Sequence, residues 1–539
     1  MQGLMMHMPL TVTSILRHAA NYHGETEVVT RSVEGPIHRT TYGELWKRSQ
    51  KLAHALKRLG VVKGDRVATL AWNTWRHMEL YYGISGSGFV CHTINPRLFK
   101  EQISFIIKHA GDKVLFADLT FLPILEALAP QLRKLKAVVM LTDGAHMPKS
   151  SALPKLKCYE ALLAREKDQF NWPELNENTA CSLCYTSGTT GEPKGVIYSH
   201  RSSVLHAMAV CTPDAFNCSA SSTVCPIVPM FHVNAWGIPY LAPMVGAKLV
   251  MPGAKLDGAS LHQLMTDEGV TFTAGVPTVW LALLDYLDAE KKTIPTLMRV
   301  GIGGSAAPPI MLQRFADRGA EVIHAWGMTE TSPVALTAAL TGKHAKLSNA
   351  EKLAKRAKQG RPLYGTEYLV VNGAGKPVKP DGQEFGDLHI RGPWVASSYF
   401  KSKEKAAFRR KGWFNTGDVV NVDEDSFFQI VDRTKDVIKS GGEWISSIEL
   451  EGIMQAHPAI KEAAVVSRPH VKWAERPVLV VILKPGAVLT YEEMVMHFTG
   501  KIAKWSIPDE LIVVDQLPHT ATGKLLKTEI RKLVLARQL

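Results

Sequence analysis

Short apolar runs bounded by Gly, Asp or Pro recur along the first 330 residues and alternate with segments of helical periodicity. The runs lie at 64–72, 88–95, 112–118, 136–142, 247–253, 270–277, 298–304 and 320–327. Most are continuous rather than alternating in polarity, which is typical of strands buried on both faces. The pattern therefore predicts an α/β protein with βαβ units, largely parallel sheets and helices on both faces of each sheet.

After about Arg361 the pattern changes to shorter strands punctuated by glycine, such as TEYLVV, GDLHIRG and FFQIVDR. This pattern predicts an antiparallel or barrel-like unit. The last hundred residues combine ELEGIMQAH with AAVVSR, VLVVILK and ELIVVDQ, and indicate a small α+β domain. The charged turn DRTKD is the expected boundary. We expect an N-terminal domain at 1–431, a hinge at 432–436 and a C-terminal domain at 437–539.

Composition adds size and charge to this picture. With 539 residues and 46% hydrophobic content, the chain is large enough for several cores. Its formal net charge of +13 fits nucleic acid, an anionic membrane or highly charged small substrates. We find no nucleic-acid-binding motif and no basic tract beyond Lys346–Arg361, so specific nucleic-acid recognition is not expected.

The seven cysteines are an odd number spread over a long chain, which favours reduced thiols in a cytoplasmic protein. Cys181 and Cys184 form a CxxC pair, but Cys218 and Cys225 are spaced too widely to complete a zinc site. We expect buried strand cysteines instead. No signal peptide and no apolar run of about 18 residues is found, so no membrane span is expected.

The segment YTSGTTGEPKGV, residues 185–196, is rich in Gly, Ser and Thr. It fails the Walker A pattern, because Lys194 follows a proline and precedes a glycine. What remains is a set of hydroxyls, glycines and one cation suited to wrapping phosphates: Thr186, Ser187, Gly188, Thr189, Thr190 and Lys194. A flexible linker is the alternative, but strand-like flanks favour a tight turn between ordered elements.

Lys524 lies in LPHTATGKLLK, more than 300 residues from that segment. Chemistry that builds negative charge on a phosphate needs such a cation. Delivery from a separate element would allow its withdrawal between two steps. The two segments together predict a two-step, ATP-consuming enzyme.

Seven motifs carry a family resemblance. They are YTSGTTGEPKGV, PMFHVNAWG (229–237), GGSAAP (303–308), AWGMTETSP (325–333), GWFNTGD (412–418), DRTKDVIKSGGEWISSIELE (432–451) and PHTATGK (518–524). In this order they resemble the AMP-forming acyl-CoA synthetase, luciferase and adenylation-domain superfamily. The resemblance covers about 41–524 and is greatest to medium- and long-chain fatty acyl-CoA ligases, with 3-methylmercaptopropionate-CoA ligases also considered.

The resemblance implies a large N-terminal domain of two doubly wound lobes plus a β-barrel-like piece, and a small mobile C-terminal domain. It implies that a carboxylate and MgATP give acyl-AMP and pyrophosphate, and that CoA then gives acyl-CoA and AMP. ATP, Mg²⁺ and CoA are the implied cofactors and co-substrates. A cytoplasmic homodimer without nucleic-acid or membrane partners is expected.

The resemblance also implies roles for single residues. Thr186, Ser187, Thr189, Thr190 and Lys194 would hold the β- and γ-phosphates. Thr329 would hold the α-phosphate, Glu330 the Mg²⁺, and Lys524 would stabilise the reacting phosphate. The remaining nucleotide-binding candidates are Gly304, Ser305, Ala306, His324, Ala325, Trp326, Gly327, Met328, Asp418 and Arg433. Trp326 stands where the family usually has Tyr, and either ring can stack on adenine.

The acyl-binding candidates are His232, Trp236, Gly303, Gly304 and Pro333, with His232 also a catalytic candidate. A core histidine is the alternative for His232, and Trp236 would cap a short pocket or gate a longer tunnel. The CoA-binding candidates are Lys439, Ser440, Gly441, Gly442, Glu443 and Trp444, and Lys435 is the hinge candidate. The basic segment Lys346–Arg361 is either a solvated helix or an attractor of CoA phosphates.

Four other functions remain open from the sequence. A long-chain fatty acyl-CoA ligase would share every motif. A carrier-protein-loading adenylation domain would need Asp after the aromatic residue of PMFHVNAWG, where this chain has His232. A luciferase-like oxygenase is compatible with the fold. A nucleotide sensor without turnover is disfavoured because Lys524 and Glu330 are both present.

Overall fold

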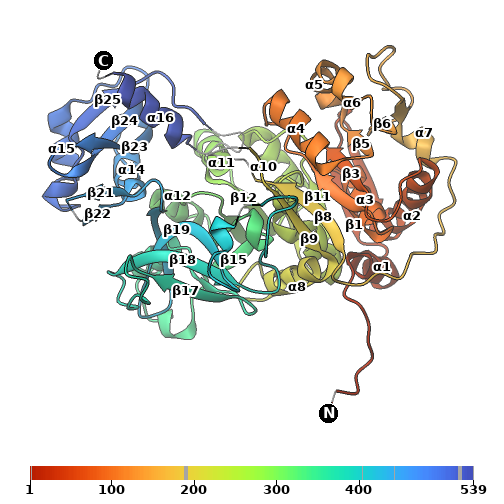
Figure 1. Ribbon diagram of the computed structural model, residues 1–539, viewed down its shortest axis with the longest axis horizontal. Helices are drawn as coiled ribbons and strands as arrows, with labels where there is room; N and C mark the ends of the chain where they lie inside the picture. The colour runs from red at the N-terminus through yellow and green to blue at the C-terminus, as the bar shows by residue number, and fades with distance from the viewer. Residues whose placement is uncertain (2, 187–191, 404, 442, 520–524, 538–539) are drawn as a thin grey trace.

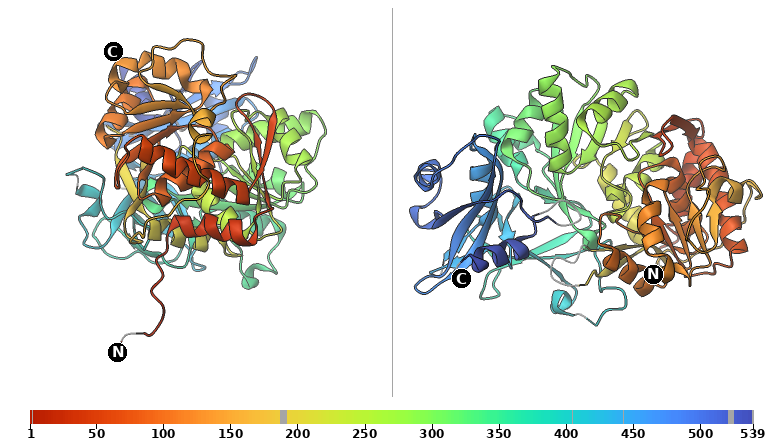
Figure 2. Two further views of the ribbon diagram at one scale, coloured as in Figure 1. Left: turned by 90° about the vertical axis from the view of Figure 1, so that its right-hand side faces the viewer. Right: turned by 90° about the horizontal axis from the view of Figure 1, so that it is seen from above.

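The computed structural model describes residues 1, 3–186, 192–403, 405–441, 443–519 and 525–537. The described residues form four β-sheets, which follow one another roughly along the chain (Figure 1). Two α/β sheets make up the larger part of the molecule. An antiparallel sheet lies beside them, and a C-terminal sheet with its own helices lies at one end of the molecule (Figures 1 and 2).

The first sheet has the order β7-β6-β5-β3-β4-β8-β9 and is parallel except for its edge strand β9. Its strands are β3 (Arg66–Leu70), β4 (Val90–Thr93), β5 (Val114–Ala117), β6 (Ala137–Met140), β7 (Leu156–Cys158), β8 (Ala180–Tyr185) and β9 (Gly195–Ser199). The helices in this part of the chain are α2 (Tyr42–Arg58), α3 (Trp75–Gly86), α4 (Lys100–Ala110), η1 (Leu119–Phe121), α5 (Leu122–Ala127), α6 (Ala129–Leu132) and α7 (Tyr159–Leu163).

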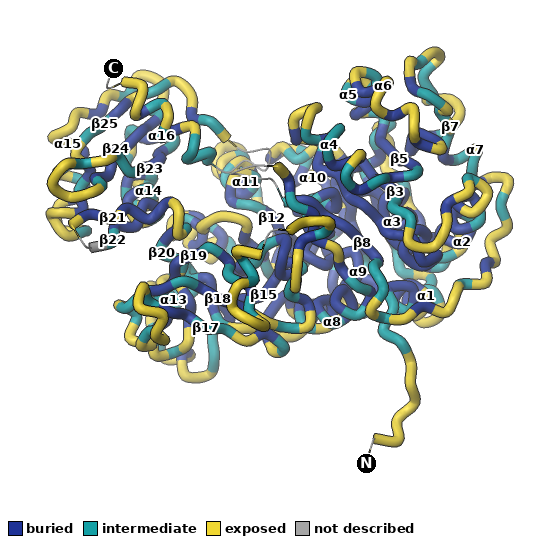
Figure 3. The backbone as a smooth tube through the Cα atoms, viewed as in Figure 1, coloured by how far each residue is buried: buried dark blue, intermediate teal, exposed yellow. Residues whose placement is uncertain are grey.

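Successive residues of the first sheet enter different cores. Val114 and Phe116 of β5 pack in the cluster that includes α2 and α3, whereas Leu115 and Ala117 pack in the cluster that includes α4. All four side chains are fully buried, and Figure 3 shows the centre of this sheet as buried, whereas its edge strand β7 is partly exposed. The alternation follows from the two-residue repeat of a strand, and it confirms the expected helices on both faces.

The second sheet has the order β16-β15-β14-β13-β12-β10-β11-β1-β2, with a parallel centre from β14 to β1. Its strands are β1 (Glu27–Arg31), β2 (Ile37–Thr41), β10 (Thr223–Pro226), β11 (Lys248–Met251), β12 (Phe272–Gly275), β13 (Arg299–Ile302), β14 (Glu321–Gly327), β15 (Val334–Thr337) and β16 (Arg361–Pro362). The accompanying helices are α1 (Val12–Tyr22), α8 (His200–Cys211), η2 (Val233–Gly237), α9 (Ile238–Val245), α10 (Gly258–Asp267), α11 (Pro277–Ala289), α12 (Pro309–Ala316), η3 (Thr329–Thr331), η4 (Gly342–His344) and α13 (Asn349–Ala357).

The third sheet, β17-β18-β19-β20, is antiparallel throughout, as the shorter strands after Arg361 predict. It contains β17 (Glu367–Val371), β18 (Phe385–Arg391), β19 (Phe414–Val422) and β20 (Phe428–Arg433), with η5 (Ala406–Phe408) before β19. The fourth sheet has the order β22-β21-β24-β23, and β25 pairs with β24. Its elements are β21 (Ile438–Ser440), β22 (Glu443–Ile445), α14 (Ser447–Gln455), β23 (Ile460–His470), β24 (Ala474–Leu483), α15 (Tyr491–Phe498), η6 (Lys504–Ser506), β25 (Glu510–Val513) and α16 (Lys527–Ala536).

The chain passes from the third sheet to the fourth between Arg433 and Ile438. The expected hinge at 432–436 spans the last two residues of β20 and the first part of this passage, while its movement and the domain limits 1–431 and 437–539 stay predictions. Cys181 and Cys184 are buried on β8, which confirms the expectation of buried strand cysteines. Within the described ranges, no helix combines the length and apolarity required to cross a bilayer.

Candidate active site

The phosphate-loop candidate connects β8 to β9, which pair in antiparallel fashion up to Tyr185 and Gly195. The Thr186 N–H donates to the Lys194 carbonyl at 2.9 Å, and the Lys194 N–H donates to Thr186 Oγ1 at 3.2 Å. These bonds fix both ends of the loop, as expected for a tight turn between ordered strands. The candidates in its centre, Ser187, Gly188, Thr189 and Thr190, lie outside the described residues.

Tyr399, which the sequence analysis missed, connects the loop to the metal candidate. Lys194 Nζ lies 5.0 Å from the centre of its ring, and its hydroxyl donates to Glu330 Oε1 at 2.7 Å. The ring is nearly buried. Tyr399 therefore orients the Glu330 carboxylate beside the cation at the end of the phosphate loop.

Glu330 is a buried carboxylate, with 5% of its surface exposed. Burial raises the pKa of its carboxyl group, while the positive charges of Arg433 and Lys194 act in the opposite direction. Among the described residues, no Lys or Arg forms a direct ion pair with it. A lone, oriented oxygen ligand next to a phosphate loop fits Mg²⁺, which is commonly held by one or two carboxylates and substrate phosphates.

Gly327, three residues before Glu330, has no space for a side chain. A methyl group built on Gly327 would lie 1.8 Å from the Pro333 carbonyl oxygen, so this position requires glycine. The Met328 N–H donates to Thr331 Oγ1 at 2.9 Å, and the Tyr198 hydroxyl donates to the Thr329 carbonyl at 2.7 Å. The backbone around the α-phosphate candidate Thr329 is therefore fixed from two sides.

Trp326, Asp418 and Arg433 meet across two sheets. The Trp326 indole N–H donates to Asp418 Oδ2 at 3.1 Å, and Arg433 lies 2.9 Å from Asp418 Oδ1. Asp418 is 2% exposed, so both contacts orient a desolvated carboxylate. Because an ionised carboxylate offers about four acceptor sites, Asp418 retains capacity for ribose hydroxyls. The tryptophan that replaces the usual tyrosine supplies a donor to the ribose candidate.

The GGSA loop follows β13 and lies against β14. A methyl group built on Gly303 would approach the Ala325 carbonyl oxygen to 2.6 Å and Trp236 Cη2 to 2.9 Å. Gly304 has φ +83°, whereas Ser305 and Ala306 are exposed. The structure therefore brings the predicted acyl wall and the predicted adenine strand into contact.

The side chain of His324 points into the protein core rather than contributing to a binding surface. Its side chain is buried, Nδ1 lies 3.0 Å from the Ala357 carbonyl oxygen, and burial lowers its pKa. These features indicate a neutral structural imidazole, so any contact of this residue with nucleotide would come through its backbone.

The motif PMFHVNAWG contains a run of left-handed backbone. Val233, Asn234, Ala235 and Trp236 have φ between +46° and +55°. Each such non-glycine residue costs roughly 1–2 kcal/mol relative to right-handed geometry. His232, just before this run, is partly buried, and its backbone N–H donates to the Pro229 carbonyl at 3.0 Å.

The CoA candidates lie on the β21–β22 hairpin of the fourth sheet. Trp444 packs against Phe385 of β18, and Lys439 lies over the Trp444 ring. Gly441 has φ +61° and donates its N–H to the Trp473 carbonyl, while Ser440 Oγ accepts from Arg476. Gly442 and the side chain of Glu443 lie outside the described residues. The hairpin therefore rests on the antiparallel sheet, and CoA binding there stays a prediction.

The hinge candidate is anchored on the C-terminal side. Asp432 accepts from the Ser447 N–H, and Arg531 contacts both the Lys435 carbonyl and Asp436. Burial lowers the pKa of Lys435. These polar contacts fix residues 432–436 against the C-terminal helices α14 and α16.

Lys524 lies outside the described residues. On either side of its segment, His519 pairs with Leu525, and the Leu526 N–H donates to the Pro518 carbonyl at 2.8 Å. The residues that flank the segment are therefore joined to each other.

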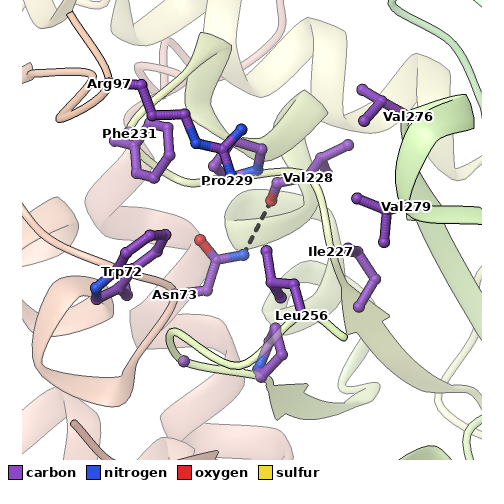
Figure 4. A pocket seen from close by; sticks show the side chains of 12 residues that line it. Trp72, Asn73, Arg97, Ile227, Val228, Pro229, Phe231, Leu256, Val276 and Val279 are labelled. Atoms are coloured by element: carbon purple, nitrogen blue, oxygen red, sulfur yellow. Dashed lines mark hydrogen bonds between the residues drawn. The ribbon is translucent and has the colours of Figure 1, made fainter. Parts of the chain in front are cut away.

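A pocket between the two α/β sheets was not predicted (Figure 4). It is lined by Trp72, Asn73, Arg97, Ile227, Val228, Pro229, Phe231, Pro252, Gly253, Leu256, Val276 and Val279. These residues follow β3, β4, β10, β11 and β12, so the pocket lies at the carboxyl ends of the strands, where α/β proteins bind ligands. Burial lowers the pKa of Arg97, and no described carboxylate forms an ion pair with it.

The basic segment after Ala345 forms ion pairs with aspartate and glutamate side chains. Lys355 pairs with Asp423 and Asp425 at 2.8 and 2.6 Å, and Arg356 pairs with Glu321 at 2.6 Å. These ion pairs attach α13 to the rest of the N-terminal part. With no buried residue in α13, they favour the interpretation as a solvated helix over attraction of CoA phosphates.

Comparisons with known proteins give a family match for the N-terminal part and another for the C-terminal part of the chain. Residues 16–400 match the family described as AMP-binding enzyme, and residues 449–524 match the AMP-binding enzyme C-terminal domain. The chain is 50% identical to a medium-chain-fatty-acid–CoA ligase of Ectopseudomonas oleovorans over 99% of this chain and 97% of that protein. It is 48% identical to a 3-methylmercaptopropionyl-CoA ligase of Ruegeria lacuscaerulensis over 98% of each. A solved anthranilate CoA ligase in complex with anthranoyl-AMP is 25% identical, with a TM-score of 0.86 over 99% of each chain.

Proposed function

The chain belongs to the family of AMP-binding enzymes and is an AMP-forming acyl-CoA ligase, and we propose that its acid substrate is of short to medium length. The observation that carries the site assignment is the convergence of Lys194, Glu330 and the Trp326–Asp418 pair beside one loop. Arg433, which pairs with Asp418 and whose charge also acts on Glu330, connects the ribose candidate to the metal candidate and supports one site for all three groups. The 3-methylmercaptopropionyl-CoA ligase among the relatives makes 3-methylmercaptopropionate a second candidate acid.

In the first step, a carboxylate oxygen attacks the α-phosphorus of ATP, and the bond to pyrophosphate breaks. In the second step, the sulfur of CoA attacks the acyl carbon, and AMP leaves with the electron pair of the broken bond. We propose that Asp418 and Arg433 bind the ribose, and that Trp326 stacks on adenine and orients Asp418. Thr186, Lys194 and Thr329 would hold the phosphates.

Mg²⁺ is proposed at Glu330, where it would neutralise charge on the triphosphate and polarise the reacting phosphoryl oxygens. The chain's own contribution is to hold the carboxylate ready. Tyr399 donates to one oxygen, and the Ala396 N–H donates to the Glu330 carbonyl at 2.7 Å. These two contacts fix the side chain and the backbone of the ligand.

We propose that Arg97 binds a phosphate group of CoA at the mouth of the pocket in Figure 4. A partly desolvated guanidinium that forms no ion pair with a described carboxylate is suited to an anionic ligand. Arg97→Gln should raise the KM for CoA about tenfold and leave the KM for ATP within about twofold. The exposed Arg133→Gln is the control. An unchanged KM for CoA at low salt would refute the assignment.

Trp236 is proposed to limit the length of the acyl chain, because its buried ring packs against Gly303. Trp236→Ala should lower kcat/KM for butyrate, because the packing lost between the ring and the acyl chain stabilises the transition state by about 1–3 kcal/mol. Decanoate should be spared or improved. A wild-type profile of kcat/KM that peaks at twelve carbons or beyond would contradict the short pocket and support a long-chain ligase, with Trp236 as a movable gate.

The experiment that tests the function is pyrophosphate release over a panel of carboxylic acids, with and without CoA. We expect release with butyrate to decanoate, and acyl-CoA only when CoA is present. Activity on amino acids with transfer to a carrier protein would support a carrier-loading enzyme. Oxygen-dependent light emission would support a luciferase-like enzyme. Nucleotide binding without turnover would support a sensor.

Assembly and location belong to the same proposal. We propose a homodimer in the cytoplasm, in keeping with the cysteine content and the family resemblance. Sedimentation equilibrium at micromolar concentration should give twice the 59.4 kDa mass of the chain.

A further inference from the structure

The left-handed run at the start of η2 requires an explanation, because none of its four residues is a glycine. φ is +46° at Val233, +50° at Asn234, +47° at Ala235 and +55° at Trp236. β-branched and bulky residues are rare in this region of backbone geometry. Such strain persists only where the surroundings hold it, and it concentrates at binding and reaction sites.

One side chain in the run makes contacts that hold it. Asn234 Nδ2 donates to Ser182 Oγ on β8 at 3.1 Å. Asn234 Oδ1 lies 3.2 Å from the Tyr81 hydroxyl on α3 and 3.5 Å from Cys184 Sγ. Asn234 is 5% exposed, and its partners are buried. If the backbone left this geometry, the amide and its partners would lose their bonds in a place that water does not reach.

The segment before the run is fixed by other groups. The Tyr81 hydroxyl shares its one proton between the Met230 carbonyl, the shorter contact, and Asn234 Oδ1. Asn73 donates to the Pro226 and Val228 carbonyls and accepts from the Met230 N–H. The entry to η2 is therefore held by Asn73, which follows β3, and by Tyr81 on α3. Within the run itself, the Asn234 amide supplies side-chain hydrogen bonds to Ser182 and Tyr81.

Trp236 follows two residues later and depends on that geometry. Its ring is 8% exposed and lies against Gly303, at the wall proposed for the acyl group. A change of φ at Asn234 would redirect the chain that carries the ring. A change at the Asn234 amide would therefore move Trp236, the residue proposed to limit acyl length.

We propose that Asn234 is a positioning residue that sets acyl-chain selectivity by holding the left-handed turn and, through it, the Trp236 ring. This inference rests on the proposed function and specifies which residue fixes its acyl pocket. Ser182 is the partner that ties the amide to the first sheet.

The test compares kcat/KM for butyrate and decanoate in Asn234→Ala. The ratio of decanoate to butyrate should rise about tenfold, while the KM for ATP stays within about twofold. Ser182→Ala should shift the ratio in the same direction by a smaller factor. The control is Ser85→Ala, which removes a buried hydroxyl that donates to the Cys181 carbonyl on β8. It should leave the ratio of decanoate to butyrate unchanged.

A double-mutant cycle separates positioning from general destabilisation. If Asn234 acts through the ring, Asn234→Ala should not change the ratio further in a Trp236→Ala background. A folded Asn234→Ala enzyme with the wild-type ratio, or an additive effect in the cycle, would overturn the inference. If Asn234→Ala does not fold, Ser182→Ala decides in the same way. Failure of the wild type to form any acyl-CoA would instead refute the proposed function.

Discussion

Lys524→Ala should abolish most of the first half-reaction and leave thiolysis of supplied acyl-AMP much less affected. The residue is a lone cation in a Thr-Gly-Lys segment, on a part of the chain distant from the phosphate loop. Loss of one well-placed stabiliser of transition-state charge costs about 3–4 kcal/mol, or roughly 10² to 10³ in rate. Single-turnover formation of acyl-AMP, without CoA, measures the effect.

The control for this substitution is Lys532→Ala, which removes an exposed lysine on α16 that pairs only with Glu529 among the described residues. It should adenylate at the wild-type rate. If Lys524→Ala forms acyl-AMP as fast as the control, the assignment of this lysine is wrong. If both half-reactions fall equally, Lys524 does not act in one step alone.

Glu330→Gln should reduce adenylation by about 10² to 10³ and make the residual rate depend on higher Mg²⁺ concentrations. The amide has the shape of the carboxyl group and can still accept from the Tyr399 hydroxyl, so the fold around it is preserved. The negative charge that would hold the cation is lost. Titration of the adenylation rate with Mg²⁺ measures the shift.

Stability gives a second readout for this variant. Because burial raises the pKa of Glu330, the folded protein pays a desolvation cost for its charged form. The neutral Gln should therefore melt no lower than wild type at neutral pH. A large fall in Tm would assign Glu330 to the core, and an unchanged dependence on Mg²⁺ would remove it from the metal site.

Much of the fold follows from the sequence, because each buried parallel strand forms a local apolar run. The eight predicted runs correspond to β3, β4, β5, β6, β11, β12, β13 and β14. The pairing of β1 with β11 could not be predicted in this way. It joins residues more than two hundred positions apart, and the short segment EVVTR carries no sign of its partner.

The candidate site was predicted unevenly for a similar reason. The motif residues Trp326 and Asp418 are joined by a hydrogen bond, and Arg433 acts on both Asp418 and Glu330, while their roles with nucleotide and metal stay predictions. Tyr399 contacts Glu330 and Lys194 across distant segments, and Arg97 lines a pocket whose walls come from distant segments, so a single tyrosine or arginine in a loop gives no signal. The left-handed backbone at Asn234 could not be predicted, because the neighbouring Val233 and Trp236 rarely adopt this conformation.

The most direct test of the central claim is mass-spectrometric detection of acyl-AMP after the enzyme is mixed with ATP, Mg²⁺ and octanoate without CoA. The account predicts one octanoyl-AMP and one pyrophosphate per active site, followed on addition of CoA by equal amounts of octanoyl-CoA and AMP. Formation of ADP and phosphate, or of octanoyl-CoA without a preceding acyl-AMP, would contradict it.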